Sequence, residues 1–399
     1  MKHRGLWAVL VASLVLNVAL ASVLGYFGHR RGWFERLAAI TKGEAEAQTA
    51  DAADWQWHDA AELTLEGRGF ADTRHRYERL PAAAEDLVRR EIWNLQQFSV
   101  GQVVRFTSDS PWLRARWRVG EPRLALANMP ATAASGVDLY IRGDDGGWHW
   151  LGIGQPRGFP VNDAMLCNFP LDGKQHEFML YLPLFNSTRT LHLGIEPGRT
   201  IEASPERQER PIVFYGSSIV QGRAVSRPGM AYPAILGRWL DRPTLNLGFS
   251  GEAIMESEVA KLLGALDAAA LVIDALPNMT PEIVRERAEP FIRLLREKQP
   301  DVPIVLVEER TRPSGAFATG AAEIVRARRA GLRDTYEKLT AAGVTGLHYV
   351  RGDELLGGDG EATVDDSHPT DLGMLRIAHH LRPVLEEVLA GGSGSDDTR

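Results

Sequence analysis

The sequence predicts an α/β domain with a doubly wound parallel sheet, preceded by an antiparallel β-sandwich domain and an N-terminal membrane anchor. Residues 1–34 contain one long apolar run between basic residues. Residues 55–205 contain short alternating segments separated by turn residues, and residues 206–390 alternate continuous apolar segments with amphipathic ones. A chain of 399 residues is long for one domain, and 44% hydrophobic content is ordinary for a globular protein. We therefore expect two folded domains after the anchor.

The N-terminal run, Leu6–Phe27, is interrupted only by small or weakly polar residues and is long enough to span a bilayer. Lys2 and Arg4 lie before it, as in an export signal. Ala19–Ala21 resembles a signal-peptidase site, but apolar residues continue to Phe27, which favours a retained anchor over cleavage. His29–Arg31 places positive charge after the span as well, so the positive-inside rule does not decide the orientation. We expect a single-pass membrane protein with an exported catalytic domain, or a secreted or periplasmic protein if the segment is cleaved.

Two polar stretches flank the folded domains. Residues 35–54 are rich in Ala, Glu and Thr without an apolar stripe, which predicts a membrane-proximal linker. Residues 391–399 are dominated by Gly, Ser and Asp and predict a disordered tail. We expect no functional site in the linker.

The β-sandwich is predicted from short alternating segments separated by Gly, Asp, Asn and Pro. These segments are Val103–Phe106, Leu113–Trp117, Asp138–Ile141, Glu177–Tyr181 and Leu191–Ile195. The turn Asp144–Gly147 is typical of a hairpin. Four tryptophans of this domain could stack on sugar rings, although core packing is the favoured interpretation. They are Trp112, Trp117, Trp148 and Trp150.

The α/β domain is predicted from continuous apolar runs followed by helical patterns. The runs are Ile212–Tyr215, Thr244–Leu247, Ala270–Leu276 and Pro303–Val307. The helical patterns are Ala231–Leu240, Ser257–Leu266, Pro281–Lys298, Ala322–Ala342 and Asp371–Leu389. Ligands of such sheets bind beyond the carboxyl ends of the strands, so loops that leave strands are the places to look for a site.

Charge and cysteine content exclude several function classes. The formal net charge of -7, with basic and acidic residues interspersed, argues against a nucleic-acid partner. The single cysteine, Cys167, excludes an internal disulfide and a multi-thiolate metal site. We interpret it as a small core residue.

A serine follows the first strand of the α/β domain. The segment Phe214–Gly222 reads Phe-Tyr-Gly-Ser-Ser-Ile-Val-Gln-Gly, and Gly216 permits a tight turn that presents the hydroxyl of Ser218 near the start of a helix. From this segment alone, a helix N-cap is an equally good interpretation of the serine.

The segment Asp365–Pro369 supplies a histidine and a carboxylate. Asp365 lies three residues before His368, so its side chain can accept the Nδ1 proton and leave Nε2 to take the proton of Ser218. A lone histidine before proline is more often structural or exposed, and the spacing of the aspartate favours the catalytic interpretation. The neighbouring Asp366 is interpreted as a solvated loop residue.

Two further loops offer donors for a developing oxyanion. Gly251 ends the segment Asn246–Gly251 after the second strand, and its backbone N–H can approach a substrate closely. Asn278 follows the third strand and offers a side-chain amide. Each loop alone is a common turn. Together, Ser, Gly, Asn and His arrive in order on separate loops.

These four segments resemble the four blocks of the SGNH (GDSL-like) hydrolase superfamily. Arg227–Pro233 and His368–Gly373 are similar to a bacterial esterase subgroup, whose N-terminal β-sandwich carries a Gly-x-Asp-Leu-Tyr motif that Gly136–Tyr140 matches. The resemblance covers both folded domains. Two departures stand out: Ser217 and Met279 occupy positions where the superfamily usually has aspartate, and the subgroup tolerates both.

The resemblance implies a serine esterase without metal or cofactor. Ser218 would be the nucleophile, His368 the general base and Asp365 its orienting acid, with the backbone N–H groups of Ser218 and Gly251 and the side chain of Asn278 as the oxyanion hole. Small acyl esters, in particular acetyl esters of carbohydrates, would be the substrates. An acyltransferase with the same acyl-enzyme and a catalytically silent glycan-binding protein are the alternatives, and the oligomeric state is left open.

One charged cluster has two interpretations. Glu308, Glu309, Arg310 and Arg312 leave the fourth predicted strand at the end of the sheet that would carry the site. They could line the pocket, but a surface ion-pair cluster is the favoured interpretation.

Overall fold

The computed structural model describes residues 54–392, of which residues 55–167 and 171–392 belong to one compact unit. The predicted anchor 1–34, nearly all of the predicted linker 35–54 and the tail after residue 392 lie outside the described residues. Between residues 54 and 392, no helix is both long and apolar enough to cross a membrane.

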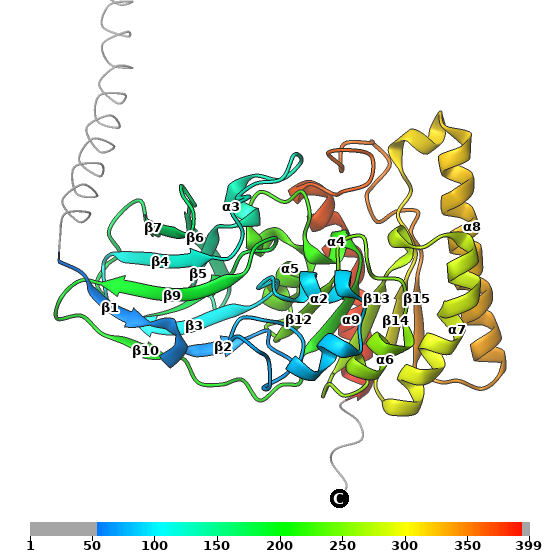
Figure 1. Cartoon of the computed structure of the whole chain (residues 1–399), viewed down its shortest axis with the longest axis horizontal. Coiled ribbons are helices and arrows are strands. Elements are labelled where there is room, and N and C mark those ends of the chain that lie inside the picture. The colour runs from blue at the N-terminus through cyan, green and yellow to red at the C-terminus, as the bar shows by residue number, and fades with distance from the viewer. Residues whose placement is uncertain (1–53, 393–399) are drawn as a thin grey trace, which may run out of the picture. The chain divides into compact units, whose positions relative to one another are not determined.

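Residues 56–203 form two antiparallel sheets, as the alternating segments predict (Figure 1). The first has the order β1 (Gln56–Asp59), β9 (Thr188–Ile195), β4 (Leu113–Val119) and β7 (Val161–Met165). The second has the order β10 (Ile201–Ala203), β3 (Val103–Ser108), β8 (His176–Tyr181), β5 (Val137–Arg142) and β6 (Trp148–Gly154), and β2 (Thr64–Glu66) pairs with β3. The predicted hairpin turn joins β5 to β6 and is confirmed.

Short helical segments lie within and between these strands. They are η1 (Ala60–Glu62), η2 (Ala82–Asp86), α2 (Arg90–Gln96) and α3 (Ala131–Ala134). In β4, buried residues alternate with arginines that are half-buried or exposed, so one face of the strand lies in the core. On that face, Trp117 is fully buried opposite Gly154 of the second sheet.

The remaining strands form one parallel sheet in the order β12-β11-β13-β14-β15, which is a doubly wound order. The strands are β11 (Ile212–Gly216), β12 (Thr244–Gly248), β13 (Ala270–Asp274), β14 (Ile304–Val307) and β15 (Leu347–Val350). The helices are α4 (Ser218–Gln221), η3 (Pro228–Met230), α5 (Tyr232–Trp239), α6 (Ser257–Leu263), η4 (Leu276–Asn278), α7 (Pro281–Lys298), η5 (Pro313–Ala316), α8 (Thr319–Ala341) and α9 (Asp371–Gly392). The predicted α/β class is confirmed, and β15 was not predicted.

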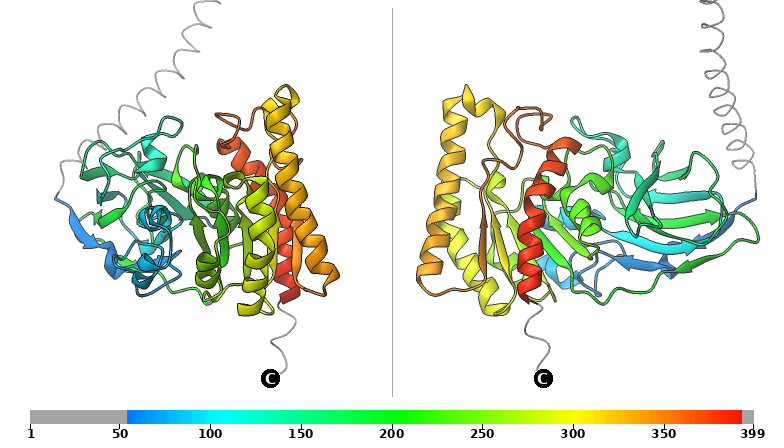
Figure 2. Two further views of the ribbon diagram at one scale, coloured as in Figure 1. Left: turned by 45° about the vertical axis from the view of Figure 1, so that its right-hand side comes forward. Right: turned by 180° about the vertical axis from the view of Figure 1, so that it is seen from behind.

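Alternate side chains of the parallel strands point to opposite faces of the sheet and pack into two separate cores. On β11, Val213 and Tyr215 pack with α6, α7 and α8, whereas Ile212 and Phe214 pack with α5 and α9. The helix α9 accordingly lies behind the sheet in Figure 1 and in front of it in the reverse view of Figure 2. Both faces of the sheet are thus covered, which leaves the carboxyl ends of its strands as the place for a site.

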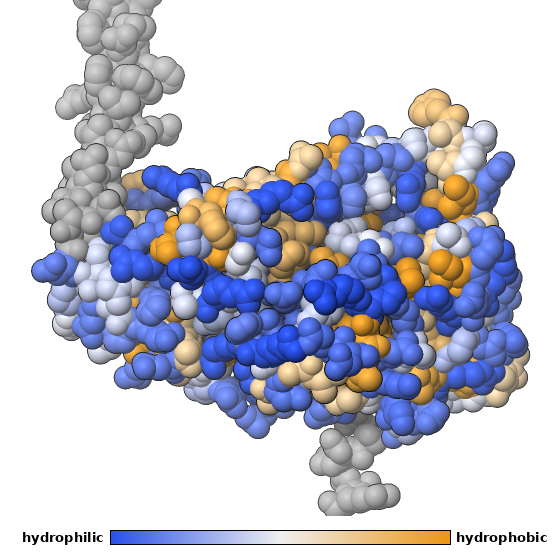
Figure 3. Space-filling model, viewed as in Figure 1, coloured by the Kyte–Doolittle hydropathy of each residue, from blue (hydrophilic) through white to orange (hydrophobic). Residues whose placement is uncertain are grey.

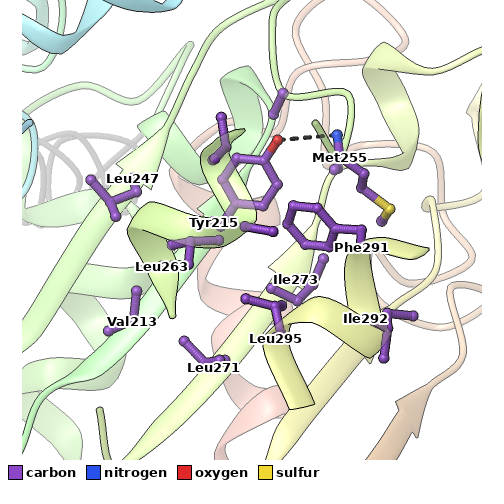
Figure 4. Close-up of a cluster of buried hydrophobic side chains, with 14 of the residues drawn as sticks. Val213, Tyr215, Leu247, Met255, Leu263, Leu271, Ile273, Phe291, Ile292 and Leu295 are labelled. Carbon is purple, nitrogen blue, oxygen red and sulfur yellow. Dashed lines mark hydrogen bonds between the residues drawn. The ribbon is translucent and has the colours of Figure 1, made fainter. Parts of the chain in front are cut away.

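The core beneath α7 contains a polar contact that fixes a functional loop (Figure 4). Tyr215 stacks on Phe291, with 5.4 Å between ring centroids, and its hydroxyl oxygen accepts a hydrogen bond of 3.2 Å from the backbone N–H of Met255. Because Met255 follows the loop that contains Gly251, the core of the sheet holds the end of that loop.

The Gly-x-Asp-Leu-Tyr segment lies against the parallel-sheet part of the chain. Asp138 is fully buried and accepts hydrogen bonds from the backbone N–H of Gly229 at 2.8 Å, from Arg227 at 3.0 Å and from the indole of Trp150 at 2.8 Å. The hydroxyl of Tyr140 also contacts Arg227. The two segments most typical of the esterase subgroup therefore bind each other.

The surface in Figure 3 is hydrophilic over most of the visible face, with smaller hydrophobic groups between. Cys167 is buried, and burial raises the pKa of its thiol to about 12. The burial of Cys167 confirms its interpretation as a small core residue.

Candidate active site

Ser218 is the first residue of α4, and only Ser217 separates it from the end of β11. The turn is tight: a Cβ added at Gly216 would lie 2.1 Å from the carbonyl oxygen of Asp274, so only glycine fits there. The N-cap of α4 is Ser217, whose hydroxyl accepts a hydrogen bond from the N–H of Ile219. The capping interpretation thus applies to Ser217 and leaves the hydroxyl of Ser218 for another partner.

That partner is His368. The Ser218 hydroxyl oxygen lies 3.0 Å from Nε2 of His368, and Nδ1 of His368 lies 2.8 Å and 3.0 Å from the two carboxylate oxygens of Asp365. Three predicted site residues, 150 positions apart at the extremes, are therefore joined in one hydrogen-bonded chain. This geometry lets the imidazole take a proton from the serine while the carboxylate faces the opposite nitrogen.

The Asp365 carboxylate is held in its ionised form. Burial raises its pKa, but hydrogen bonds from the backbone and ring of His368 and from Asn128 outweigh this effect and lower the pKa to about 2. The backbone N–H of His368 donates to Oδ1 of Asp365 at 2.8 Å, and that of Ser367 at 3.2 Å. The spacing of three residues thus allows the loop to fold back on the carboxylate.

Asp366 is not a merely solvated loop residue, and that interpretation was wrong. Its carboxylate accepts hydrogen bonds from the backbone N–H of Ser314 at 2.7 Å and from the Ser314 hydroxyl at 2.6 Å. It adopts a left-handed φ of 70° to do so. Asp366 therefore ties the loop of Asp365 to η5, while Asp365 alone faces the histidine.

The two predicted oxyanion donors lie on loops that contact each other. The side-chain nitrogen of Asn278 donates to the carbonyl oxygen of Phe249 at 3.2 Å, which uses one of its two protons and leaves the other free. Gly251 has a φ of 82°, and a Cβ added there would meet no atom within 4 Å, so its backbone borders open space. Met279, which replaces the usual aspartate, is fully buried in the core.

A buried charged network supports the turn beneath Ser218. Asp274 ends β13, and its carboxylate forms two contacts with the guanidinium of Arg310 and accepts a hydrogen bond of 2.9 Å from the hydroxyl of Tyr232. All three residues are at most 3% exposed. The carbonyl oxygen of Asp274 accepts a hydrogen bond of 3.0 Å from the N–H of Ser217. We did not single out Asp274 or Tyr232 from the sequence, because no local pattern marks them as partners.

The cluster after β14 forms ion pairs, as the favoured interpretation predicted, but the predicted surface location was wrong. Glu308, Glu309 and Arg310 are buried, and Arg312 is half-buried. Glu308 and Glu309 form ion pairs with arginines of α8, so this helix covers the end of the strand. The position of a helix over a strand end depends on tertiary packing, which the local charge pattern does not reveal.

The tryptophans of the antiparallel part divide into two groups. Trp112 and Trp117 are buried, so core packing is confirmed for them. Trp148 packs beside the small cluster around Tyr140. Trp150 is 48% exposed, with the guanidinium of Arg227 5.1 Å from its ring centroid. Among the described residues, no group of three or more His, Cys, Asp or Glu side chains is arranged to hold a metal ion.

Two family models match the chain. Residues 209–386 match the GDSL-like lipase/acylhydrolase family, and residues 55–201 match the N-terminus of esterases of the SGNH hydrolase type. No curated protein sequence matches the chain.

Solved structures resemble both parts together. A protein from Bacteroides ovatus that is described as a GDSL-like lipase has 34% identity and a TM-score of 0.80, over 84% of this chain and 98% of its own. A salicylyl-acyltransferase from a tetracycline biosynthetic pathway has 18% identity and a TM-score of 0.67, over 86% and 99%. An acetyl xylan esterase from Butyrivibrio proteoclasticus has 12% identity and a TM-score of 0.53, over 85% and 99%. The last two show the fold alone.

Proposed function

The chain belongs to the GDSL-like lipase/acylhydrolase family, as its loop segments predicted, and we propose that it hydrolyses small acyl esters through an acyl-enzyme on Ser218. Membership makes it a serine hydrolase of the esterase class. The observation that supports the assignment of roles is the chain of hydrogen bonds from Ser218 through His368 to Asp365, with distances of 3.0 Å and 2.8 Å.

The proposed reaction has two steps. The hydroxyl oxygen of Ser218 attacks the ester carbonyl carbon while Nε2 of His368 takes its proton, and Asp365 stabilises the imidazolium. The negative oxygen of the tetrahedral intermediate would accept hydrogen bonds from the backbone N–H groups of Ser218 and Gly251 and from the Asn278 amide. Collapse breaks the ester bond, and the alcohol leaves with the proton from His368.

In the second step, water attacks the acyl-serine. His368 takes a proton from the water, a second tetrahedral intermediate forms, and Ser218 leaves with that proton, which releases the carboxylic acid. Water has access to the site, since the side chains of His368 and Asp365 are 21% and 37% exposed. This exposure favours hydrolysis over transfer of the acyl group to another alcohol. Transfer is the second candidate, because the salicylyl-acyltransferase shares the fold over nearly its whole length.

We propose acetyl esters of carbohydrates as the substrate class. The acetyl xylan esterase named above shares this two-part fold. Trp150, in the antiparallel part, is 48% exposed, and aromatic side chains at a surface can stack on sugar rings. Both points support the proposal by analogy of fold and chemistry.

A fluorophosphonate probe tests the proposed nucleophile. The intact protein should be labelled, and Ser218→Ala should lose labelling and at least about 10⁴-fold in hydrolysis of 4-nitrophenyl acetate. Ser257→Ala is the matched control, because Ser257 is an exposed serine of the same part of the chain and should leave both unchanged. Undiminished labelling of Ser218→Ala would remove the proposal, and no labelling of the intact protein would favour a silent glycan-binding protein.

The substrate class needs a separate measurement. Acetate released from a panel of acetylated glycans should exceed the acid released from longer-chain aryl esters at equal concentration. An added alcohol that diverts most of the acyl group from water would favour the acyltransferase instead.

A further inference from the structure

We propose that Asn128 is a positioning residue of the active site, whose side-chain amide holds the Asp365 carboxylate in the orientation that supports His368. The inference rests on the proposed function, since it assigns a role toward the same triad. Asn128 precedes Asp365 by 237 residues and lies in the antiparallel part of the chain. The antiparallel part would then contribute a positioning side chain to the active site.

The segment that carries Asn128 is a tight turn between β4 and α3. The backbone groups of Leu126 and Met129 exchange two hydrogen bonds, of 3.0 Å and 3.1 Å, which places Asn128 near the tip of the turn. On α3, the hydroxyl of Thr132 donates to the carbonyl oxygen of Ser226 at 2.6 Å. The turn is therefore tied to the parallel-sheet part close to Asn128.

The contacts of Asn128 fix the orientation of its amide. Its Oδ1 accepts a hydrogen bond of 3.0 Å from Nε of Arg223, and its Nδ2 donates a hydrogen bond of 2.7 Å to Oδ2 of Asp365. A guanidinium only donates and a carboxylate only accepts, so the opposite orientation would lose both bonds. Arg223 thus aims the donor of Asn128 at the carboxylate.

This donor completes the set of contacts around Asp365. Backbone N–H groups of Ser367 and His368 donate to Oδ1, whereas Oδ2 faces Nδ1 of His368 and the Asn128 amide. Without Asn128, the half-exposed carboxylate could rotate and accept from water instead of from the ring. The Nδ2 atom of Asn128 is 3.5 Å from Nδ1 of His368, longer than its distance to Asp365, so it acts on the histidine through the carboxylate.

A double-mutant cycle with Asp365→Ala separates positioning from mere structural support. With Asp365 present, Asn128→Ala should lower kcat for 4-nitrophenyl acetate about 10- to 100-fold, the range for a hydrogen bond to a charged group, with KM largely unchanged. Asn128→Asp keeps the shape but replaces the donor by a second negative charge and should lose at least as much. In the Asp365→Ala background, Asn128→Ala should cause no further loss.

Asn186→Ala is the control for loop support. Its side chain exchanges two 2.9 Å hydrogen bonds with the backbone of Glu121, at the start of the same loop, and its other hydrogen bonds go to Ser135 and Ser187 rather than to the triad. Asn186→Ala should lower the urea midpoint of unfolding. It should reduce kcat by the same factor in the wild-type and Asp365→Ala backgrounds. Urea unfolding of each Asn128 variant shows whether the fold is retained.

Three results would overturn the inference: equal losses from Asn128→Ala in both backgrounds, a raised KM with unchanged kcat, or wild-type rates in a folded Asn128→Ala protein. These results differ from a failure of the proposed function. If hydrolysis depends on Ser218 but not on Asn128, only the inference fails; if Ser218→Ala retains full activity, the proposed function itself fails.

Discussion

At the scale of single residues, the ionisation of Asp365 gives a prediction for stability. Its pKa of about 2 lies below the ordinary value of 3.8, so the folded protein binds this proton less readily than the unfolded chain. The contribution of Asp365 to stability is therefore fully present above pH 3.8 and is lost as the pH falls toward 2. Asp365→Asn should be less stable than wild type near neutral pH, and this difference should shrink across that acidic range.

Urea unfolding of both proteins at several pH values between neutrality and the acidic range measures this difference. A difference that stays constant, or grows on acidification, would contradict the assignment of an ionised, hydrogen-bonded Asp365. The same assignment means that Asp365 does not change its charge near neutral pH, so it is not the source of any pH dependence of hydrolysis there.

At the scale of helices, strands and loops, much of the fold and site is predictable from local patterns. Ser218, Gly251 and Asn278 each follow a buried apolar strand, and parallel strands place their carboxyl ends at one edge of the sheet. The strand Leu347–Val350 escaped prediction because it is short, carries a histidine and is mostly half-buried at the sheet edge.

Local sequence patterns do not predict the contacts between elements that lie far apart in the sequence. Asp274 ends β13 and Arg310 lies three residues after the end of the neighbouring β14, and nothing in either segment indicates that each is the other's buried partner. Asn128 lies in a loop without a recognisable motif, and its contact with Asp365 depends on how the two parts of the chain pack.

The end of β12, from which the loop with Gly251 leaves, gives a prediction at this scale. Arg79, from the antiparallel part, is 1% exposed, and it donates to the carbonyl oxygens of Asn246 at 3.2 Å, Gly248 at 2.7 Å and Leu95 at 2.6 Å. Burial lowers its pKa to about 9. Arg79→Met leaves these carbonyls without their donor, so we expect a loss of about 1–3 kcal/mol in the free energy of unfolding and slower fluorophosphonate labelling.

Urea unfolding measures the loss of stability, and the rate of fluorophosphonate labelling measures the effect on the site. Arg89→Met is the comparison. Arg89 contacts Glu252 in the same loop and Glu256 at its end, but Arg89 is 36% exposed, so its removal should cost less. If Arg79→Met matches wild type in both measurements, the buried guanidinium does not hold the loop.

At the scale of the whole molecule, we predict that both parts unfold in one transition. Asp138 and Arg79 each form buried contacts across the boundary between the antiparallel and parallel sheets, and residues 55–167 and 171–392 lie in one compact unit. Separating the two parts would leave the N–H of Gly229 and the guanidinium of Arg227 without their buried acceptor, which is costly. Neither part should therefore remain folded once the other has unfolded.

The distribution of aromatic residues and helices allows each part to be followed separately. Seven of the ten tryptophans lie within residues 55–205: Trp55, Trp57, Trp93, Trp112, Trp117, Trp148 and Trp150. The long helices α7, α8 and α9 all belong to the parallel-sheet part. Tryptophan fluorescence and helical circular dichroism should consequently give the same urea midpoint, and Asp138→Ala should lower it. Two midpoints in the wild-type protein would mean that the parts are independent, and the antiparallel part could then leave Asp365 without its Asn128 contact while the parallel sheet stays folded.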